Sequence, residues 1–354
     1  MNSGGSTGSG TGTAPTLEDV ARAAGVSRAT VSRVVNGVRN VDPAIAEAVR
    51  RAVVATGYVP NRAARSLVTR RSGAVALVVS GAGSETAQVF QDPFFGRVVG
   101  GVVRALRPRG VHPVLLFADS AQDRNEVLDH LGRGGADGAL LVTTHGDDPL
   151  PAMLAAAGIP AVLFARPATA GLALDSVDLR HGEGGALAAR HLVARGRTRL
   201  AAIGGPVDVA ASRERVAGFR AALGGRGDGG GRGGDGDVRV VQADFTVEGG
   251  EHAMRRLLAE QPDLDGVFAA NDLMALGACL VLREHGRRIP QDVAVIGFDD
   301  SSAATASRPR LTTVRQPVED MAAEMVRLLL DRAPDRTEPE VVLFDGELVI
   351  RDSA

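Results

Sequence analysis

Residues suited to contacting DNA bases stand close together near the N-terminus, in the run TLEDVARAAGVSRATVSRVVNG at 16–37. Arg28, Ala29 and Arg33 fall on the outward face of the second of two short predicted helices. Arginine can donate a pair of hydrogen bonds to guanine, and the methyl group of alanine can contact that of thymine. The pattern favours a helix that enters a DNA major groove. A purely structural helical hairpin is the alternative.

A second set of candidate residues lies in the body of the chain, after short apolar runs that read as strands. In open sheets of parallel strands, ligands bind beyond the carboxyl ends of the strands. Carboxylates, guanidinium groups, an amide and aromatic faces at these positions suit a small ligand with many hydroxyl groups. The candidates in the first half are Asp92, Phe94, Phe95, Asp119, Thr143 and Ala165, and those in the second half are Arg213, Arg215, Asp244, Phe245, Asn271, Asp272, Asp299 and Asp300. Asn271 and Asp272 have the alternative of capping the next helix, and Asp300 is expected to be structural.

Capping and turn residues predict the elements that position the first set. Thr16 can cap a first helix, and Asp19 completes an approximate capping box three residues later. Gly25 permits the positive φ of a tight turn, and Ser27 caps the second helix, on which Val31 faces inward. Two short helices around such a turn are typical of a helix-turn-helix.

The elements that position the second set follow from the alternation of apolar runs and amphipathic helical stretches beyond residue 72. The expected strands are 74–80, 112–118, 138–143, 159–165, 199–205, 238–244, 265–272 and 292–300, and the expected helices include 95–110, 184–196 and 319–333. Such βαβ units predict parallel sheets buried on both faces. Their number and length favour two doubly wound halves over one barrel.

The fold class expected is therefore an all-α head followed by an α/β core of two doubly wound parallel-sheet subdomains. The expected divisions are a disordered tail at 1–15, the head at 16–60, a hinge helix or linker at 61–71, a first core subdomain at 72–168 and 315–338, and a second at 169–314 and 339–354. The glycine-rich segment 224–237 is expected to be a flexible surface insertion.

The distribution of charge supports a head that binds a polyanion. Residues 16–71 hold ten arginines against four acidic residues, whereas the rest of the chain holds 30 basic against 38 acidic residues. Cys279 is the single cysteine, so no disulfide framework exists and a reducing compartment is expected. No signal peptide or membrane-spanning apolar run is evident, and we expect a cytoplasmic protein without a membrane partner.

The head resembles that of the lactose-repressor (LacI/GalR) family in two motifs, T-V-S-R-V-x-N from Thr30 to Asn36 and Y-x-P-N-x-x-A-x-x-L from Tyr58 to Leu67. The resemblance implies phosphate contacts from Ser27, Thr30, Ser32 and Asn36, and base contacts from Arg28, Ala29 and Arg33. The full set of DNA-contacting residues that it implies is Thr16, Ser27, Arg28, Ala29, Thr30, Ser32, Arg33, Asn36, Tyr58, Asn61, Ala64 and Leu67.

The same resemblance implies that residues 61–67 form a hinge helix that folds only on operator DNA. The segment has good helix formers but is too short to be helical alone. Ala64 and Leu67 would then enter the minor groove, and Leu67 would wedge open a central base step. An ordinary core leucine is the alternative interpretation of Leu67.

The body resembles the same family through R-x-A-G-F at 215–219, A-N-D-x-M-A-x-G at 270–277, G-F-D-D at 297–300 and D-P-F-F at 92–95, and the ending G-E-L-V-I-R-D-S also fits. The match implies a periplasmic-binding-protein-like core with an effector in the cleft between its halves. The effector-binding residues that it implies are Phe94, Phe95, Arg215, Phe245, Asn271 and Asp299. Ala165 stands where some sugar-binding members have aspartate and Leu273 where some have glutamine, so a lactose-like galactoside is not supported.

These observations predict a homodimeric repressor of an inverted-repeat operator whose affinity is controlled by a carbohydrate effector. No cofactor and no metal are expected, because the histidines and the single cysteine show no metal-ligand spacing. The absence of a nucleophile elbow and a phosphate-binding loop argues against an enzyme. Two alternatives stay open, namely a DNA-binding regulator that responds to a protein partner and a transport-type sugar-binding protein with an incidental head.

Overall fold

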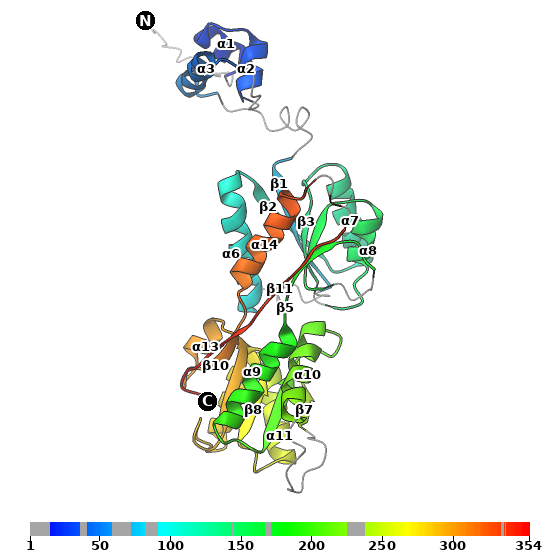
Figure 1. Cartoon of the computed structure of the whole chain (residues 1–354), viewed down its shortest axis with the longest axis vertical. Helices are drawn as coiled ribbons and strands as arrows, with labels where there is room; N and C mark the ends of the chain where they lie inside the picture. The colour runs from blue at the N-terminus through cyan, green and yellow to red at the C-terminus, as the bar shows by residue number, and fades with distance from the viewer. Residues whose placement is uncertain are drawn as a thin grey trace, which may run out of the picture. The chain divides into compact units, whose positions relative to one another are not determined.

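The computed structural model describes residues 15–35, 41–58, 72–81, 91–143, 145–166, 171–224, 238–333, 336 and 338–354. The chain forms two compact units, Met1–Ser72 and Gly73–Ala354, called here the head and the body (Figure 1). The tail, hinge and glycine-rich insertion expected from the sequence lie outside the described residues, apart from residues 15 and 224.

Three helices form the described part of the head: α1 (Leu17–Ala24), α2 (Arg28–Val35) and α3 (Pro43–Thr56). The predicted capping box is present, because the Thr16 hydroxyl accepts from the Asp19 amide while the Asp19 carboxylate accepts from the Thr16 amide at 2.9 Å. Gly25 ends α1 with φ 68°, in the left-handed region that favours glycine. The sequence therefore predicted the start, turn and cap of this unit correctly.

A small apolar core holds the three head helices together. Val20, Val31 and Val49 contribute one fully buried side chain from each helix. Complete burial of a valine side chain stabilises a fold by roughly 1.5–3 kcal/mol. The core therefore fixes the angle between α1 and α2, and the outward face of α2 is left for other contacts.

The first sheet of the body contains β1 (Ala74–Ser80), β2 (His112–Ala118), β3 (Ala139–Thr143), β4 (Ala161–Phe164), β5 (Asp175–Leu179) and β11 (Val341–Phe344). Its strand order is β11-β5-β4-β3-β1-β2, and all its pairings are parallel. This sheet and its helices are called the first lobe.

The second sheet contains β6 (Leu200–Gly204), β7 (Arg239–Gln242), β8 (Gly266–Ala269), β9 (Ala294–Asp299), β10 (Thr312–Arg315) and β12 (Glu347–Val349). Its order is β12-β10-β9-β8-β6-β7, parallel except where β12 runs antiparallel to β10. This sheet and its helices form the second lobe. The predicted architecture of two doubly wound parallel sheets is confirmed.

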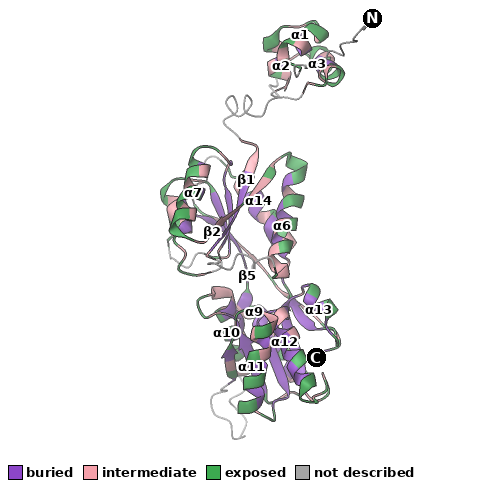
Figure 2. Cartoon of the chain, turned by 180° about the vertical axis from the view of Figure 1, so that it is seen from behind, coloured by how far each residue is buried: buried purple, intermediate pink, exposed green. Residues whose placement is uncertain are grey.

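Helices cover both faces of each sheet. Those of the first lobe are α6 (Pro93–Leu106), the 3₁₀ turn η2 (Arg107–Arg109), α7 (Ala121–Gly132), α8 (Leu150–Ala156) and α14 (Val318–Leu330). Those of the second lobe are α9 (His181–Ala194), α10 (Ala210–Gly224), α11 (Val247–Glu260), α12 (Asp272–Glu284) and α13 (Ser302–Ala306). The helices pack as pairs, α6 with α14, α9 with α10 and α11 with α12. Figure 2 shows the buried residues concentrated along the strands of both lobes.

The structure corrects the expected division of the body. The sequence assigned 169–314 and 339–354 to the second subdomain, but β5 and β11 both lie in the first sheet. Their polar content explains the error for β5, in which Asp175 and Asp178 are buried although no apolar run marks the strand. Asp175 is matched by Arg336 and by the amide of Glu340 at 2.8 Å. Buried charge is tolerated where it is paired in this way.

Candidate functional site

The outward face of α2 carries the predicted base-reading residues. Arg28, Ala29 and Arg33 are exposed, and Thr30 and Ser32 are half-buried. Arg28 also forms an ion pair with Glu18 of α1 at 3.2 Å, which leaves the remaining edge of its guanidinium group open. These side chains are exposed enough to contact the base edges in a DNA major groove.

The small polar residues of the head serve the fold as well. Ser27 caps α2, since its hydroxyl oxygen accepts from the Thr30 amide at 3.1 Å, and the two hydroxyl groups lie 2.9 Å apart. Tyr58 is half-buried and packs against the head core. The remaining residues that the resemblance implied for DNA contact lie outside the described residues; they are Asn36, Asn61, Ala64 and Leu67.

Arg215 is the most heavily constrained polar side chain of the body. It lies on α10 with 6% of its surface exposed, and its guanidinium carbon lies 3.8 Å from the centre of the Phe298 ring. Its Nε donates to His181 at 3.2 Å, Nη1 to the Ala270 carbonyl at 2.7 Å and Nη2 to Gln316 at 3.0 Å. Every nitrogen of the group thus has a partner, which fixes the plane of the guanidinium.

Asp299 faces Arg215 from the end of β9. Its Oδ1 lies 3.3 Å from Arg215 Nη1, and burial raises the pKa of the carboxyl while the nearby arginines lower it. Apart from this Arg215 contact, no donor among the described residues bonds to that Oδ1, which therefore keeps acceptor capacity. Its backbone has φ 102°, a conformation that costs a non-glycine residue on the order of 1–3 kcal/mol and tends to occur at functional sites.

Asp92 of the first lobe interacts electrostatically with Asp299, and it precedes the aromatic residues Phe94 and Phe95. It caps α6 through the Phe94 amide at 2.9 Å, and burial together with the charge of Asp299 raises its pKa to about 6. The rings of Phe94 and Phe95 meet edge to face at 5.2 Å, and Phe94 meets Phe164 at 5.3 Å. Residues of both lobes thus contribute to one electrostatically coupled group.

Phe245 and Asn271 also contact each other. The Asn271 amide group donates to the Phe245 carbonyl at 2.9 Å, and its oxygen caps α12 through the Met274 amide at 2.9 Å. Phe245 has φ 66°, and its ring lies against Gly205, where a Cβ would be 2.3 Å from a ring carbon. The capping alternative therefore holds for Asn271.

Asp272 and Asp300 serve the fold of the second lobe. Asp272 is the first residue of α12 and not its cap; it accepts from the Ser301 amide at 2.7 Å and from the Thr313 hydroxyl at 2.6 Å. Burial raises the pKa of Asp272 to about 8. Asp300 pairs with Arg315 at 2.8 Å and with Arg351, as expected of a structural residue.

Three residues that hold Arg215 were not identified from the sequence. His181 lies two residues after β5 and Gln316 directly follows β10, which are two of the strands that the sequence pattern missed, and Phe298 lies within β9. The rule that selected the other candidates, position after a strand, would have found His181 and Gln316 had those strands been predicted.

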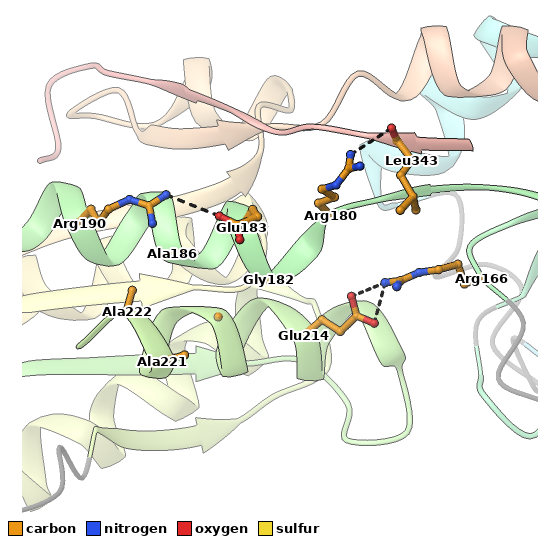
Figure 3. Close-up of a pocket in the computed structure, with 11 residues that line it drawn as sticks. Arg166, Arg180, Gly182, Glu183, Ala186, Arg190, Glu214, Ala221, Ala222 and Leu343 are labelled. Carbon is orange, nitrogen blue, oxygen red and sulfur yellow. Dashed lines mark hydrogen bonds and ion pairs between the residues drawn. The ribbon is translucent and has the colours of Figure 1, made fainter. Parts of the chain in front are cut away.

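A cavity of about 480 Å³ lies elsewhere, between α9, α10 and β11 (Figure 3). None of the six predicted effector-binding residues lines it. Its arginines already face carboxylates: Arg166 bonds to Glu214 at 2.6 Å, and Arg180 pairs with Asp345 at 3.2 Å. Because these charges are matched, the group around Arg215 and Asp299 is the stronger candidate for a ligand site.

The described residues place no three histidine, cysteine or carboxylate side chains together as metal ligands. Over the same residues, no helix has the length and apolar character required to cross a bilayer.

Comparison with known proteins identifies the class. Residues 16–61 match bacterial regulatory proteins of the lacI family, and residues 189–354 match the periplasmic binding protein-like domain. Together with the relatives below, these matches show that the chain belongs to the LacI family. It is a DNA-binding transcriptional regulator, as the sequence predicted.

Its relatives cover nearly the whole chain. The HTH-type transcriptional regulator CelR of Thermobifida fusca is 46% identical over 344 residues, which are 96% of this chain and 98% of CelR. The ribose operon repressor of Escherichia coli strain K12 is 33% identical over 328 residues, or 91% of this chain and 94% of the repressor. Both relatives are regulators of transcription.

Two solved structures share the fold. A transcriptional regulator CelR–cellobiose complex has a TM-score of 0.72 and 43% identity, covering 96% of this chain and all of that one. The Lac repressor dimer bound to operator and the anti-inducer ONPF has a TM-score of 0.77 and 25% identity, covering 96% and 99% of the two chains.

Proposed function

We propose that this chain is a homodimeric repressor whose affinity for an inverted-repeat operator is controlled by cellobiose or a closely related glucose disaccharide. The observation that carries the proposal is the buried pair of Arg215 and Asp299, in which a fixed guanidinium faces a carboxylate oxygen with unused acceptor capacity. Bidentate charged groups of this kind suit the paired hydroxyls of a sugar. The cellobiose complex of the related regulator supports the choice of sugar.

In this proposal the effector lies between the lobes. Arg215 and Asp299 bind hydroxyl groups from the second lobe, with Asn271 beside them. Phe94 and Phe95 offer aromatic faces from the first lobe, and Phe245 offers one from the second. Aromatic rings suit the apolar faces of sugar rings, and a site with few polar groups among such rings is typical of small-ligand sites.

The DNA assignment is also part of the proposal. Arg28, Ala29 and Arg33 read base edges, and the small polar residues of α2 contact phosphates. Asn61, Ala64 and Leu67 remain proposed minor-groove contacts of a hinge at 61–71. Since operator DNA is the partner, we infer that the protein acts in the cytoplasm, without catalytic activity or a cofactor.

Calorimetric titration with cellobiose tests the effector site. Wild-type protein should bind the sugar, and Arg215→Met and Asp299→Asn should each abolish detectable binding. Arg213→Ala is the matched control: the sequence offered this residue of the same helix as a ligand candidate, but its side chain is exposed and donates to the Val207 carbonyl at 2.7 Å, away from Asp299. Titrations in the presence of maltose, lactose or ribose establish which of these sugars compete with cellobiose for the site. Unchanged cellobiose affinity in both site variants would move the site elsewhere.

A further inference from the structure

The orientation of Arg215 depends on a histidine that the proposed function does not use. His181 begins α9 with 5% of its surface exposed, and its Nδ1 lies 3.2 Å from the Nε of Arg215. On the opposite side of the ring, Nε2 lies 3.3 Å from Oδ1 of Asp178 in β5. The imidazole thus stands between a permanent cation and a carboxylate.

The chemistry of these neighbours fixes where the ring proton is. An arginine Nε–H can only donate, so Nδ1 of His181 must accept and carries no proton. The proton is therefore on Nε2, which donates to Asp178. A second proton would set two N–H groups against each other across 3.2 Å. Only the neutral tautomer with the proton on Nε2 satisfies both contacts.

Asp178 is in turn held in place by Arg166 and by the backbone of β5. Its Oδ2 accepts from Arg166 Nε at 2.5 Å, and its Oδ1 accepts from the Leu179 amide at 2.8 Å. Arg166 also bonds to Glu214 of α10 at 2.6 Å. The charged groups that face His181 are therefore Arg215, Asp178 and Arg166.

The balance of these groups keeps the imidazole neutral at physiological pH. Burial, followed by the positive charges of Arg215 and Arg166, lowers the pKa of His181 to about 4, although the bond to Asp178 opposes this shift. The hydrogen bonds from His181 and Arg166 lower the pKa of Asp178 to about 2 against the effect of burial. The tautomer required by the geometry is thus the stable form at physiological pH.

We propose that His181, held by Asp178, is a positioning residue that orients the Arg215 guanidinium toward Asp299 for effector binding. This rests on the proposed function, because Arg215 is taken to be the residue that contacts the sugar. Phe298 and the Ala270 carbonyl fix the plane and one edge of the guanidinium. His181 sets its rotation by holding Nε.

Sugar binding by two variants separates positioning from packing. His181→Leu removes the acceptor for Arg215 Nε, and its affinity for cellobiose should fall at least about tenfold, since a buried donor is left unpaired. In His181→Asn the side-chain oxygen can take the place of Nδ1, so most of the affinity should return although the bond to Asp178 is lost. His191→Asn, near the other end of α9, is the matched control and should bind as wild type does.

A measurement without sugar tests the same idea independently. In ¹⁵N NMR spectra of the full chain, the His181 ring, assigned by its loss in His181→Asn, should show an unprotonated Nδ1 and a protonated Nε2. This state should persist from about pH 8 to about pH 5.5, where an ordinary histidine becomes protonated. An imidazolium or the opposite tautomer would overturn the positioning role, as would wild-type sugar affinity in His181→Leu. Failure of wild-type protein to bind any sugar would instead overturn the proposed effector.

Discussion

Four acidic side chains act on the buried guanidinium of Arg215. Burial lowers the pKa of Arg215, and the negative charges of Asp299, Asp92, Asp272 and Asp178 raise it. Even with Arg166 beside Asp178 and Arg97 beside Asp299, four ionised carboxylates would leave an uncompensated negative charge in a poorly solvated region, which is costly. Burial and the charge of Asp299 raise the pKa of Asp92 to about 6 and that of Asp272 to about 8, so these two groups keep their protons to a higher pH than an exposed aspartate does.

The protonation of Asp272 leads to a pH-dependent stability. Because its pKa in the folded state is about 8 and its ordinary value is 3.8, the native state binds a proton that the unfolded state lacks between these pH values. Its stabilising contribution is complete below the lower value and is lost as pH rises, by up to about 1.4 kcal/mol per pH unit.

Asp272→Asn should remove this dependence, because the amide oxygen can accept from Ser301 while the amide nitrogen donates to the Thr313 hydroxyl oxygen. Urea unfolding at several pH values measures it. Relative to the variant, wild-type protein should lose stability between about pH 5 and pH 8. Parallel stability curves would show that Asp272 is ionised in the folded state.

Arg33 allows the DNA assignment to be tested at a single residue. If it reads a base, Arg33→Ala should cost roughly 1–3 kcal/mol in affinity for the selected operator and relax the sequence preference at one base pair per half-site. Arg50→Ala on α3 removes the same charge and should weaken all duplexes about equally. Duplexes selected from a random pool and titrated by fluorescence anisotropy provide the measurement. Equal losses in the two variants on every duplex would contradict base reading.

At the scale of elements, long apolar runs were predictable and short strands were not. All eight strands expected from the sequence form, with ends that agree within three residues. The strands that were missed, β5, β10, β11 and β12, have three to five residues, and Thr312 and Thr313 of β10 are buried polar residues. Their pairing depends on strands distant in sequence, which no local pattern reveals. His181 and Gln316 were not identified from the sequence for the same reason, because they follow two of these strands.

The close contact of α9 and α10 gives a prediction for this pair of helices. A Cβ at Gly218 would lie 1.9 Å from the Gly182 carbonyl oxygen, a backbone atom that cannot move aside alone. Gly218→Ala should therefore destabilise the second lobe by roughly 1–3 kcal/mol and weaken sugar binding, because Arg215 lies one turn away.

Gly224→Ala, at the end of the same helix, is the matched control. None of the described residues has an atom within 4 Å of its added methyl group, so stability should change by less than about 0.5 kcal/mol. Thermal unfolding of both variants measures the difference. Equal melting temperatures for Gly218→Ala and wild type would mean that the helices pack less closely than the structure has them.

At the scale of the molecule, the two lobes of the body meet at the residue proposed to bind the effector. Arg97 of α6 donates to the Asp299 carbonyl at 2.8 Å and to the Gln316 carbonyl at 2.9 Å, while its Nε bonds to Glu319 at 2.9 Å. A ligand that moves Asp299 must therefore act on a helix of the first lobe. A ligand shifts such an equilibrium only through its different affinities for the two arrangements.

Operator release is the most direct test of the central claim that sugar bound at Arg215 and Asp299 controls DNA binding by the head. An operator duplex selected by wild-type protein is titrated with and without saturating cellobiose, and anisotropy gives the Kd. The sugar should change the wild-type Kd by about 5–150-fold. Arg215→Met and Asp299→Asn should bind the duplex as wild type does and show no change with sugar. A wild-type Kd that is the same with cellobiose and every other sugar tested, or site variants that respond as wild type does, would contradict the account.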